Sequence, residues 1–150
     1  HNLNGGLQDL RAHFGNLSLS SVYESEPVGF KGECFFNMAV ALESSLSISE
    51  VSIILKKIED RHGRIRGGKH FAPRTLDIDI VCYGDQHGIF DGVELPRAEL
   101  YYNGFVLWPM AELAPRDIDI KTGLTYESLW LAKQEEIERQ QKVWRIDFEC

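Results

Sequence analysis

Two aspartates, Asp77 and Asp79, are separated by a single residue inside an otherwise apolar stretch. If this stretch is a strand, both carboxylates lie on one face, and Leu76, Ile78 and Ile80 lie on the other. Two carboxylates about 6 to 7 Å apart repel each other and resist burial, and a divalent cation would relieve this cost. Oxygen ligands that leave coordination positions for water and phosphate suit Mg²⁺ better than zinc. The alternative, in which the strand is half exposed and both aspartates face water, stays open on spacing alone.

Cations gather immediately before the aspartate pair. Arg64, Arg66, Lys69 and Arg74 lie in or beside the glycine-rich stretch 63–73, which has too few apolar residues to pack and is predicted to be an exposed, mobile loop. Such cations can close over a polyphosphate, and phosphoryl transfer needs mainly positioning, metal and distributed positive charge. Each arginine alone could be an ordinary surface cation. The stretch lacks the Gly-x-x-x-x-Gly-Lys-Ser/Thr spacing of a P-loop.

Length and charge narrow the class of protein. The chain has 150 residues, which fits a single domain. Its 16 Lys and Arg residues against 23 Asp and Glu residues give a formal net charge of −7, so a broad basic face for nucleic acid is not expected. Apolar runs are far shorter than the roughly 20 residues that cross a bilayer. We therefore expect a cytoplasmic monomer that binds neither nucleic acid nor membranes.

The three cysteines give no sign of a metal or disulfide site. Cys34, Cys82 and Cys150 are odd in number, widely spaced and without CxxC pairing. This pattern argues against a disulfide framework and against a zinc site. We expect two buried thiols and one at the tail.

The periodicity of apolar residues predicts the elements that position the aspartate pair. Helical spacing predicts a helix over 3–14, and alternation predicts strands over 17–24 and 35–42 that pair with each other. The Ser-x-x-Glu spacing at the start of 47–61 is that of a capping box, and it predicts a helix. The aspartate pair then falls on a third strand, over 74–83.

The second half of the chain is predicted to be mainly helical. Residues 84–93 are predicted to form a polar connection or a small hairpin. A short helix is expected over 105–113, with Pro109 tolerated only near its first turn, and a polar helix over 126–141. A second Asp-Ile-Asp sequence, at 117–119, has no cation nearby and is predicted to be a solvated edge.

This order of elements predicts an α/β fold of the α+β type. One more strand ahead of the first helix would complete the β-α-β-β-α-β order of a ferredoxin-like sandwich, in which helices pack on a mostly antiparallel sheet. The sequence opens at His1, directly on a helical pattern. Because a sheet without a central strand would expose two unpaired edges, we expect the natural chain to possess that first strand.

The stretch 70–81, which contains the aspartate pair, and the stretches 23–29, 35–37, 63–66 and 104–109 together form a specific pattern. They resemble the 6-hydroxymethyl-7,8-dihydropterin pyrophosphokinase family of the folate pathway, and the twelve residues 70–81 are similar to its signature. This resemblance implies a ferredoxin-like α/β fold. It also implies transfer of pyrophosphate from ATP to the pterin hydroxymethyl group, with release of AMP.

The resemblance further implies roles for individual residues. The implied catalytic residues are Arg64, Arg74 and Asp77, and two Mg²⁺ ions would be held by Asp77 and Asp79. The implied ATP contacts are Glu59, Arg64, Arg66, Arg74, Ile80 and Arg97. The implied pterin contacts are Ser25, Val28, Phe35, Asn37, Asp77 and Phe105. Two aromatic faces and one amide suit a flat ring with alternating polar edge atoms, although either phenylalanine alone could be ordinary core packing.

Departures from the family pattern leave other hypotheses open. Arg97 and Asn103 stand where better-known members carry a histidine and an arginine that hold ATP, and Asn103 cannot supply charge. Glu26 replaces a usual proline. Arg97, Asn103 and the missing first strand motivate the alternative of a non-catalytic or weakened paralogue that binds a pterin or nucleotide. A ferredoxin-like RNA-binding module is disfavoured by the net charge and the paired aspartates.

Overall fold

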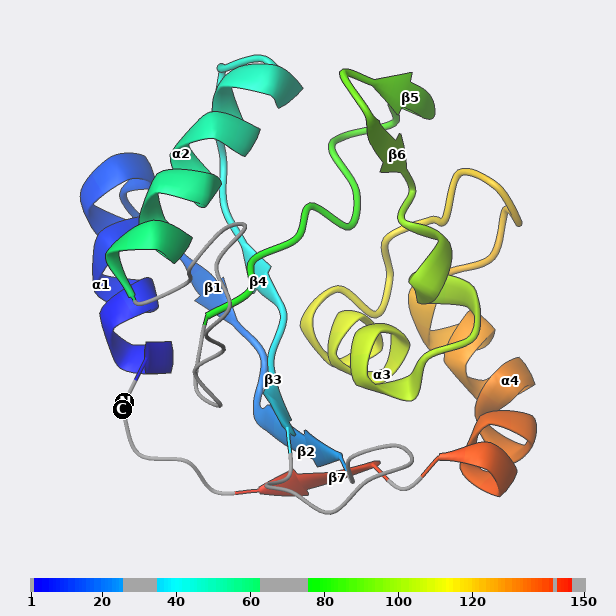
Figure 1. Cartoon of the computed structure of the whole chain (residues 1–150). Helices are drawn as coiled ribbons and strands as arrows, with labels where there is room; N and C mark the ends of the chain where they lie inside the picture. The colour runs from blue at the N-terminus through cyan, green and yellow to red at the C-terminus, as the bar shows by residue number, and fades with distance from the viewer. Residues whose placement is uncertain (1, 26–34, 63–75, 142, 147–150) are drawn as a thin grey trace.

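The computed structural model of the protein describes residues 2–25, 35–62, 76–141 and 143–146, which combine helices with short antiparallel strands (Figure 1). The helices are α1 (Asn2–Phe14), α2 (Ile48–Arg61), the 3-10 helix η1 (Ala98–Tyr101), α3 (Gly104–Leu113) and α4 (Tyr126–Gln140). The strands are β1 (Ser18–Leu19), β2 (Val22–Ser25), β3 (Phe35–Asn37), β4 (Val40–Ala41), β5 (Gly88–Phe90), β6 (Val93–Leu95) and β7 (Val143–Ile146). The predicted mixture of helices and antiparallel sheet is confirmed.

The two strands predicted over 17–24 and 35–42 pair with each other, but each is interrupted. β1 pairs with β4, and β2 lies between β3 and β7, all antiparallel. At the interruption, Ser20 holds the two strand segments together. Its N–H donates to the carbonyl of Ala39 at 3.0 Å, and its Oγ accepts the N–H of Ala39 at 2.8 Å. A side chain thus replaces part of the ladder where the strands bend.

Helices α1 and α2 pack side by side along one side of the strands (Figure 1). We call their buried apolar residues the α1–α2 cluster; its members are Leu7, Leu10, Val51, Leu55 and Ile58. The predicted capping box starts α2, since the Oγ of Ser47 accepts the N–H of Glu50 at 3.1 Å and the Glu50 carboxylate accepts the N–H of Ser47 at 3.0 Å. The cap and the apolar stripe together position the last turn of α2, which carries Glu59.

Helices α3 and α4 form a second packed unit on the other side of the strands (Figure 1). We call its buried apolar residues the α3–α4 cluster; its members are Leu100, Leu107, Ala111, Tyr126, Leu129, Trp130 and Ile137. Trp108 stacks on Trp130 with ring centroids 5.5 Å apart. The prediction that Pro109 is tolerated only near the first turn is wrong, because Pro109 lies at the middle of α3, fully buried. Tertiary packing here outweighs the loss of one helical N–H.

The predicted small hairpin within 84–93 is confirmed and extends further, because β5 pairs with β6 over 88–95. The predicted strand over 74–83 is not found in its described part. Residues 76–83 have no ladder partner among the described strands. Their backbone groups bond elsewhere instead: the N–H of Ile78 donates to the carboxylate of Glu59, and the carbonyl of Val81 accepts the N–H of Arg97 at 2.8 Å.

The second Asp-Ile-Asp sequence is not a solvated edge as a whole. Asp117 is exposed, but Asp119 is completely buried. The Asp119 carboxylate accepts the hydroxyl of Tyr101 at 2.7 Å and both the N–H and the hydroxyl of Thr122, at 3.0 and 2.7 Å. Three donors meet this carboxylate, so a turn can bury it without a cation.

Some predictions fall outside the described residues, namely the loop 63–73 and the thiols of Cys34 and Cys150. Cys82 is half-buried, and burial raises the pKa of its thiol. Within the described ranges, no helix has both the length and the apolar character needed to span a bilayer.

Glu112 joins α3 to β2 and to Ser21, the residue just before β2. Its carboxylate accepts the N–H and the hydroxyl of Ser21, at 2.9 and 2.7 Å, and the hydroxyl of Tyr23 at 2.6 Å. Burial acts to raise the pKa of Glu112, but the hydrogen bonds from Tyr23 and Ser21 outweigh it and hold the pKa below its usual range. The ionised carboxylate is therefore the form that fastens α3 to β2.

We expect Glu112→Gln to reduce the decrease in the free energy of unfolding that occurs as the pH becomes acidic. Because the folded-state pKa is lowered, the carboxylate stabilises the fold fully above its unfolded value of 4.5, and this contribution is lost as the pH falls through the folded pKa. Urea unfolding across acidic pH measures the effect, with the exposed Glu43→Gln as the matched control. A decrease as large in E112Q as in the wild type would refute this role.

Candidate active site

The segment 76–80 carries the aspartate pair in the alternation that the sequence predicts. Leu76, Ile78 and Ile80 are half-buried and pack against the α1–α2 cluster. Asp77 and Asp79 are exposed between them, and the Asp79 side chain is 51% accessible. The apolar side chains therefore anchor the segment and leave both carboxylates accessible to a ligand or to water.

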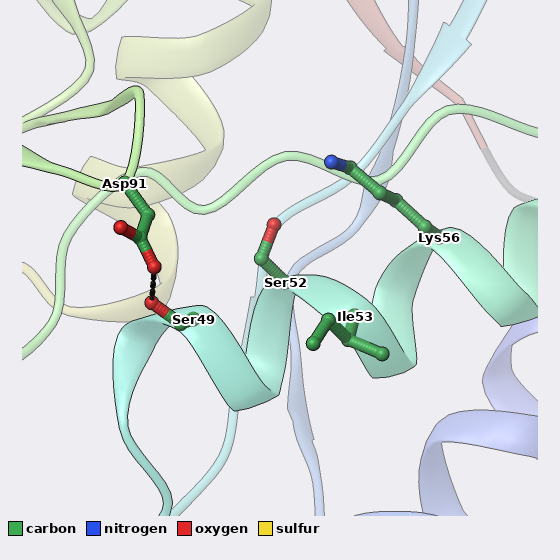
Figure 2. Close-up of a pocket in the computed structure, with 5 residues that line it drawn as sticks. All are labelled: Ser49, Ser52, Ile53, Lys56 and Asp91. Atoms are coloured by element: carbon green, nitrogen blue, oxygen red, sulfur yellow. Dashed lines mark hydrogen bonds between the residues drawn. The ribbon is translucent and has the colours of Figure 1, made fainter.

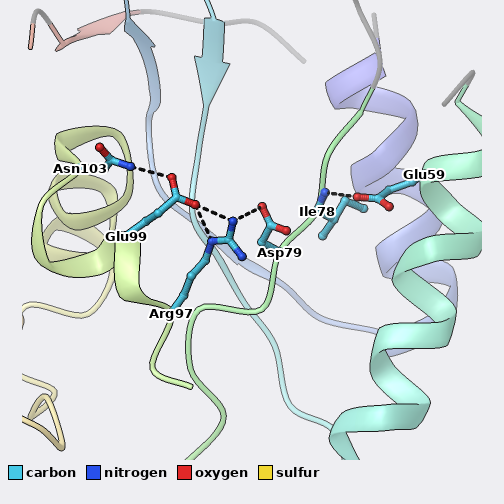
Figure 3. Close-up of polar contacts among 6 residues, drawn as sticks. All are labelled: Glu59, Ile78, Asp79, Arg97, Glu99 and Asn103. Carbon is cyan, nitrogen blue, oxygen red and sulfur yellow. Dashed lines mark hydrogen bonds and ion pairs between the residues drawn. The ribbon is translucent and has the colours of Figure 1, made fainter. Parts of the chain in front are cut away.

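Glu59 holds this segment from the last turn of α2. Its Oε2 accepts the N–H of Ile78, the residue between the two aspartates, at 2.7 Å (Figure 3). Glu59 is only 7% exposed, and it lies near the C-terminal end of a helix, where the helix dipole disfavours an anion. A hydrogen bond from a backbone N–H to the carboxylate offsets part of that cost. The structure thus places Glu59, predicted as an ATP contact, behind the aspartate pair.

Arg97, the residue just before η1, lies beside the aspartate pair. Its guanidinium lies 3.6 Å from Oδ2 of Asp79, and its Nε donates to Oε1 of Glu99 at 2.8 Å (Figure 3). The Arg97 side chain is 37% exposed, so a cation beside Asp79 stays within reach of solvent. The structure thus brings Arg97, predicted to contact ATP, beside Asp79, predicted to hold magnesium.

Asn103 is buried rather than presented to solvent. Its Nδ2 donates to Oε2 of Glu99 at 2.6 Å, and its Oδ1 accepts Nε2 of Gln141 at 2.7 Å. Gln141 also accepts the N–H of Gly104 at 2.7 Å. Both polar atoms of the Asn103 amide are thus bonded within the protein.

The residues predicted to contact the pterin lie on β2, β3 and α3. Asn37 is half-buried at the end of β3 and is paired in register with Tyr23 of β2. Ser25 and Phe35 are paired in register on the same two strands. Phe105 is half-buried in the first turn of α3, which packs against β2.

Four predicted site residues, Val28, Arg64, Arg66 and Arg74, lie outside the described residues. Glu99 and Gln141 were not predicted to belong to the site, and the structure adds both. Glu99 and Asn103 have helical i, i+4 spacing, which could have suggested their hydrogen bond. The contact of Gln141 spans 37 residues of chain to Gly104, and local spacing carries no signal for it.

A profile of the family described as 7,8-dihydro-6-hydroxymethylpterin-pyrophosphokinase (HPPK) matches residues 1–115, a range that includes the aspartate pair, Arg97 and α3. The chain belongs to the HPPK family. The HPPK match ends before α4 and β7, so Gln141 lies beyond it.

Curated relatives agree with the HPPK assignment. The chain is 40% identical over 106 residues to the 2-amino-4-hydroxy-6-hydroxymethyldihydropteridine pyrophosphokinase of Synechocystis sp., covering 71% of this chain and 54% of the relative. It is 35% identical over 96 residues to the protein of the same name from Bacillus subtilis, covering 63% and 57%. With the protein of that name from Porphyromonas gingivalis it shares 34% identity over 122 residues, covering 75% and 80%. The chain thus spans little more than half the length of the first two relatives.

The HPPK aspartate pair provides the oxygen donors that a magnesium ion accepts. Asp77 and Asp79 are two carboxylates on the exposed side of one segment, with no thiol or imidazole in the set. Within the described ranges, no group of three or more His, Cys, Asp or Glu side chains could hold a metal ion. Two carboxylates leave coordination positions for water and phosphate oxygens, which fits Mg²⁺.

A shallow pocket lies elsewhere, between the first half of α2 and the β5–β6 hairpin (Figure 2). It is lined by Ser49, Ser52, Ile53, Lys56 and Asp91, and the hydroxyl of Ser49 donates to the carboxylate of Asp91. None of these residues was predicted to belong to the HPPK site. The lining includes one cationic side chain, Lys56, and one anionic side chain, Asp91. We assign the pocket no part in the chemistry.

We expect Glu59→Ala to loosen the aspartate-bearing segment. Loss of the acceptor would raise the amide hydrogen exchange rate of Ile78 by about tenfold, the value of one hydrogen bond to a charged group. Glu59→Gln keeps an acceptor oxygen and should retain most of the protection, and the exposed Lys57→Ala serves as the control on α2. Unchanged exchange at Ile78 in E59A would contradict this positioning role.

Proposed function

We propose that this chain is an ATP-dependent pyrophosphokinase that transfers pyrophosphate to 6-hydroxymethyl-7,8-dihydropterin and releases AMP, in folate biosynthesis. The observation that carries this proposal is the HPPK match over residues 1–115, which contains an accessible aspartate pair held in place from behind. In the proposed reaction, the pterin hydroxyl oxygen bonds to the β-phosphorus of ATP. The bond from that phosphorus to the oxygen of the α-phosphate breaks, AMP leaves with the electron pair, and the hydroxyl proton is released to water.

The aspartate pair would hold Mg²⁺, two ions by analogy with the family. Magnesium, when bound, would neutralise phosphate charge and align the triphosphate. Asp77 and Asp79 would supply carboxylate oxygens, and the apolar neighbours packed on the α1–α2 cluster would keep those oxygens turned outward. Positioning of this kind costs little at the moment of reaction because the bond to Glu59 and the apolar packing already hold the segment.

Arginines would bind ATP, and aromatic side chains would bind the pterin. Arg97, beside Asp79, would contact ATP phosphates, together with Arg64, Arg66 and Arg74 from the part of the chain outside the described residues. Phe105 and Phe35 would stack on the pterin, and Asn37 would bond its polar edge. The remaining proposed contacts are Glu59 and Ile80 for ATP, and Ser25, Val28 and Asp77 for the pterin.

A weakened or binding-only paralogue is the second candidate, and Asn103 favours it. Its amide is buried, is bonded to Glu99 and Gln141, and carries no charge to offer the ATP phosphates. Calorimetry with ATP, Mg²⁺ and the pterin, run beside an assay of AMP formation, separates the candidates. Binding without AMP release would favour the paralogue.

We expect Asp77→Ala and Asp79→Ala each to lower the rate of Mg²⁺-dependent AMP formation by about 10²- to 10³-fold or more, since metal charge on the phosphates supplies several kcal/mol of the barrier lowering. The fold should persist, because both side chains are exposed and the Arg97 ion pair is worth about 1 kcal/mol or less. The matched control is Asp117→Ala, the exposed aspartate of the second Asp-Ile-Asp sequence. AMP formation near the wild-type rate in D77A or D79A would overturn the proposed function.

A further inference from the structure

A continuous chain of polar contacts connects Asp79 with the end of α4. From Asp79 the chain passes to Arg97 and then to Glu99, whose two oxygens accept different donors (Figure 3). The Oε1 of Glu99 accepts the Nε of Arg97, and its Oε2 accepts the Nδ2 of Asn103. Asn103 then accepts the side-chain N–H of Gln141, the C-cap residue of α4.

The chemistry of each group dictates the orientation of the next. An ionised carboxylate accepts hydrogen bonds and cannot donate them, so Glu99 requires the NH₂ end of the Asn103 amide. The Asn103 oxygen must then face Gln141, which has to present its own NH₂ end. The remaining Gln141 oxygen is thereby aimed at the N–H of Gly104, which it meets at 2.7 Å.

Gln141 thus supplies the cap that α3 lacks locally. The first N–H groups of a helix have no partner within the helix, and Asn103, at the N-cap position of α3, makes no capping bond with its side chain. The bond from Gly104 to Gln141 fills this role from 37 residues away. Asn103 and Gly104 are buried, so each unmade bond here would carry the full desolvation cost of a polar group.

We propose that Gln141 is a positioning residue of the active site, acting on both substrates through two separate arms. One arm caps α3 and places Phe105, the next residue after Gly104, for the pterin. The other arm runs through Asn103 and Glu99 and holds Arg97 beside Asp79, for ATP. This inference rests on the proposed function, and it assigns a role to the part of the chain beyond the HPPK match.

Two substitutions separate the arms. Gln141→Leu removes both. Gln141→Glu keeps an acceptor for the N–H of Gly104, where the helix dipole favours a negative charge, but it faces the oxygen of Asn103 with another acceptor and so disrupts the arm to Arg97. The neighbouring exposed Gln140→Leu is the matched control.

Each arm has a readout that does not depend on turnover. Amide exchange at Gly104 reports the cap, and the Nε–H signal of Arg97 in nitrogen-15 NMR spectra reports the bond to Glu99. We expect Q141L to accelerate exchange at Gly104, to weaken the Arg97 signal, and to raise the KM values for pterin and for ATP by about three- to tenfold with a smaller change in kcat. In Q141E, the Gly104 protection and the pterin KM should stay near wild type, while the Arg97 signal and the ATP KM change as in Q141L.

The outcomes are decisive for each claim separately. If Q141L matches Q140L in Gly104 exchange and in both KM values, Gln141 has no positioning role, although the proposed function stands as long as D77A and D79A are inactive. If Q141E leaves the Arg97 signal unchanged, the arm to Asp79 is refuted. If the wild-type chain forms no AMP, the proposed function fails, and the positioning role is then judged on the Gly104 and Arg97 signals and on calorimetric affinities for ATP and the pterin.

Discussion

A backbone N–H that lies between two aspartates, with no described strand beside it, needs an acceptor, and the buried carboxylate of Glu59 supplies one. The cost of burying Glu59 and the cost of an unpaired N–H at Ile78 are both large, and the single 2.7 Å bond reduces both. The same bond turns Ile78 toward the α1–α2 cluster, so Asp77 and Asp79 must face outward. Accessibility of the aspartate pair therefore depends on a polar contact made behind it.

The segment that carries the pair also bridges the two halves of the molecule. Leu76, Ile78 and Ile80 pack on the α1–α2 cluster, whereas Val81 packs on the α3–α4 cluster. A polar connection runs in parallel, from Asp79 through Arg97 to the start of α3. Both helical units thus contact the same short segment, 76–81. The chemistry proposed for that segment needs groups from each unit.

Local patterns were reliable where the partners are close in sequence. The capping box at Ser47, the helices and the β5–β6 hairpin depend on neighbours within a few residues, and the structure confirms them. The two Asp-Ile-Asp sequences mark the limit of such patterns. In the first, the aspartates are exposed and the isoleucine packs inward; in the second, Asp119 is buried and Ile118 is 60% exposed. Tyr101, 18 residues before Asp119, supplies a donor that the local sequence does not reveal.

By itself the sequence determined the helices, the capping box of α2, the alternation around the aspartate pair and the HPPK family, because each depends on residue types at short and regular spacing. Tertiary structure alone decided which group accepts the N–H of Ile78, which residue caps α3, and that the amide of Asn103 is bonded within the protein. These contacts join residues 19 to 38 positions apart. Such partners meet only after the apolar clusters have packed, and the packing, rather than any local preference, then selects among the available donors and acceptors.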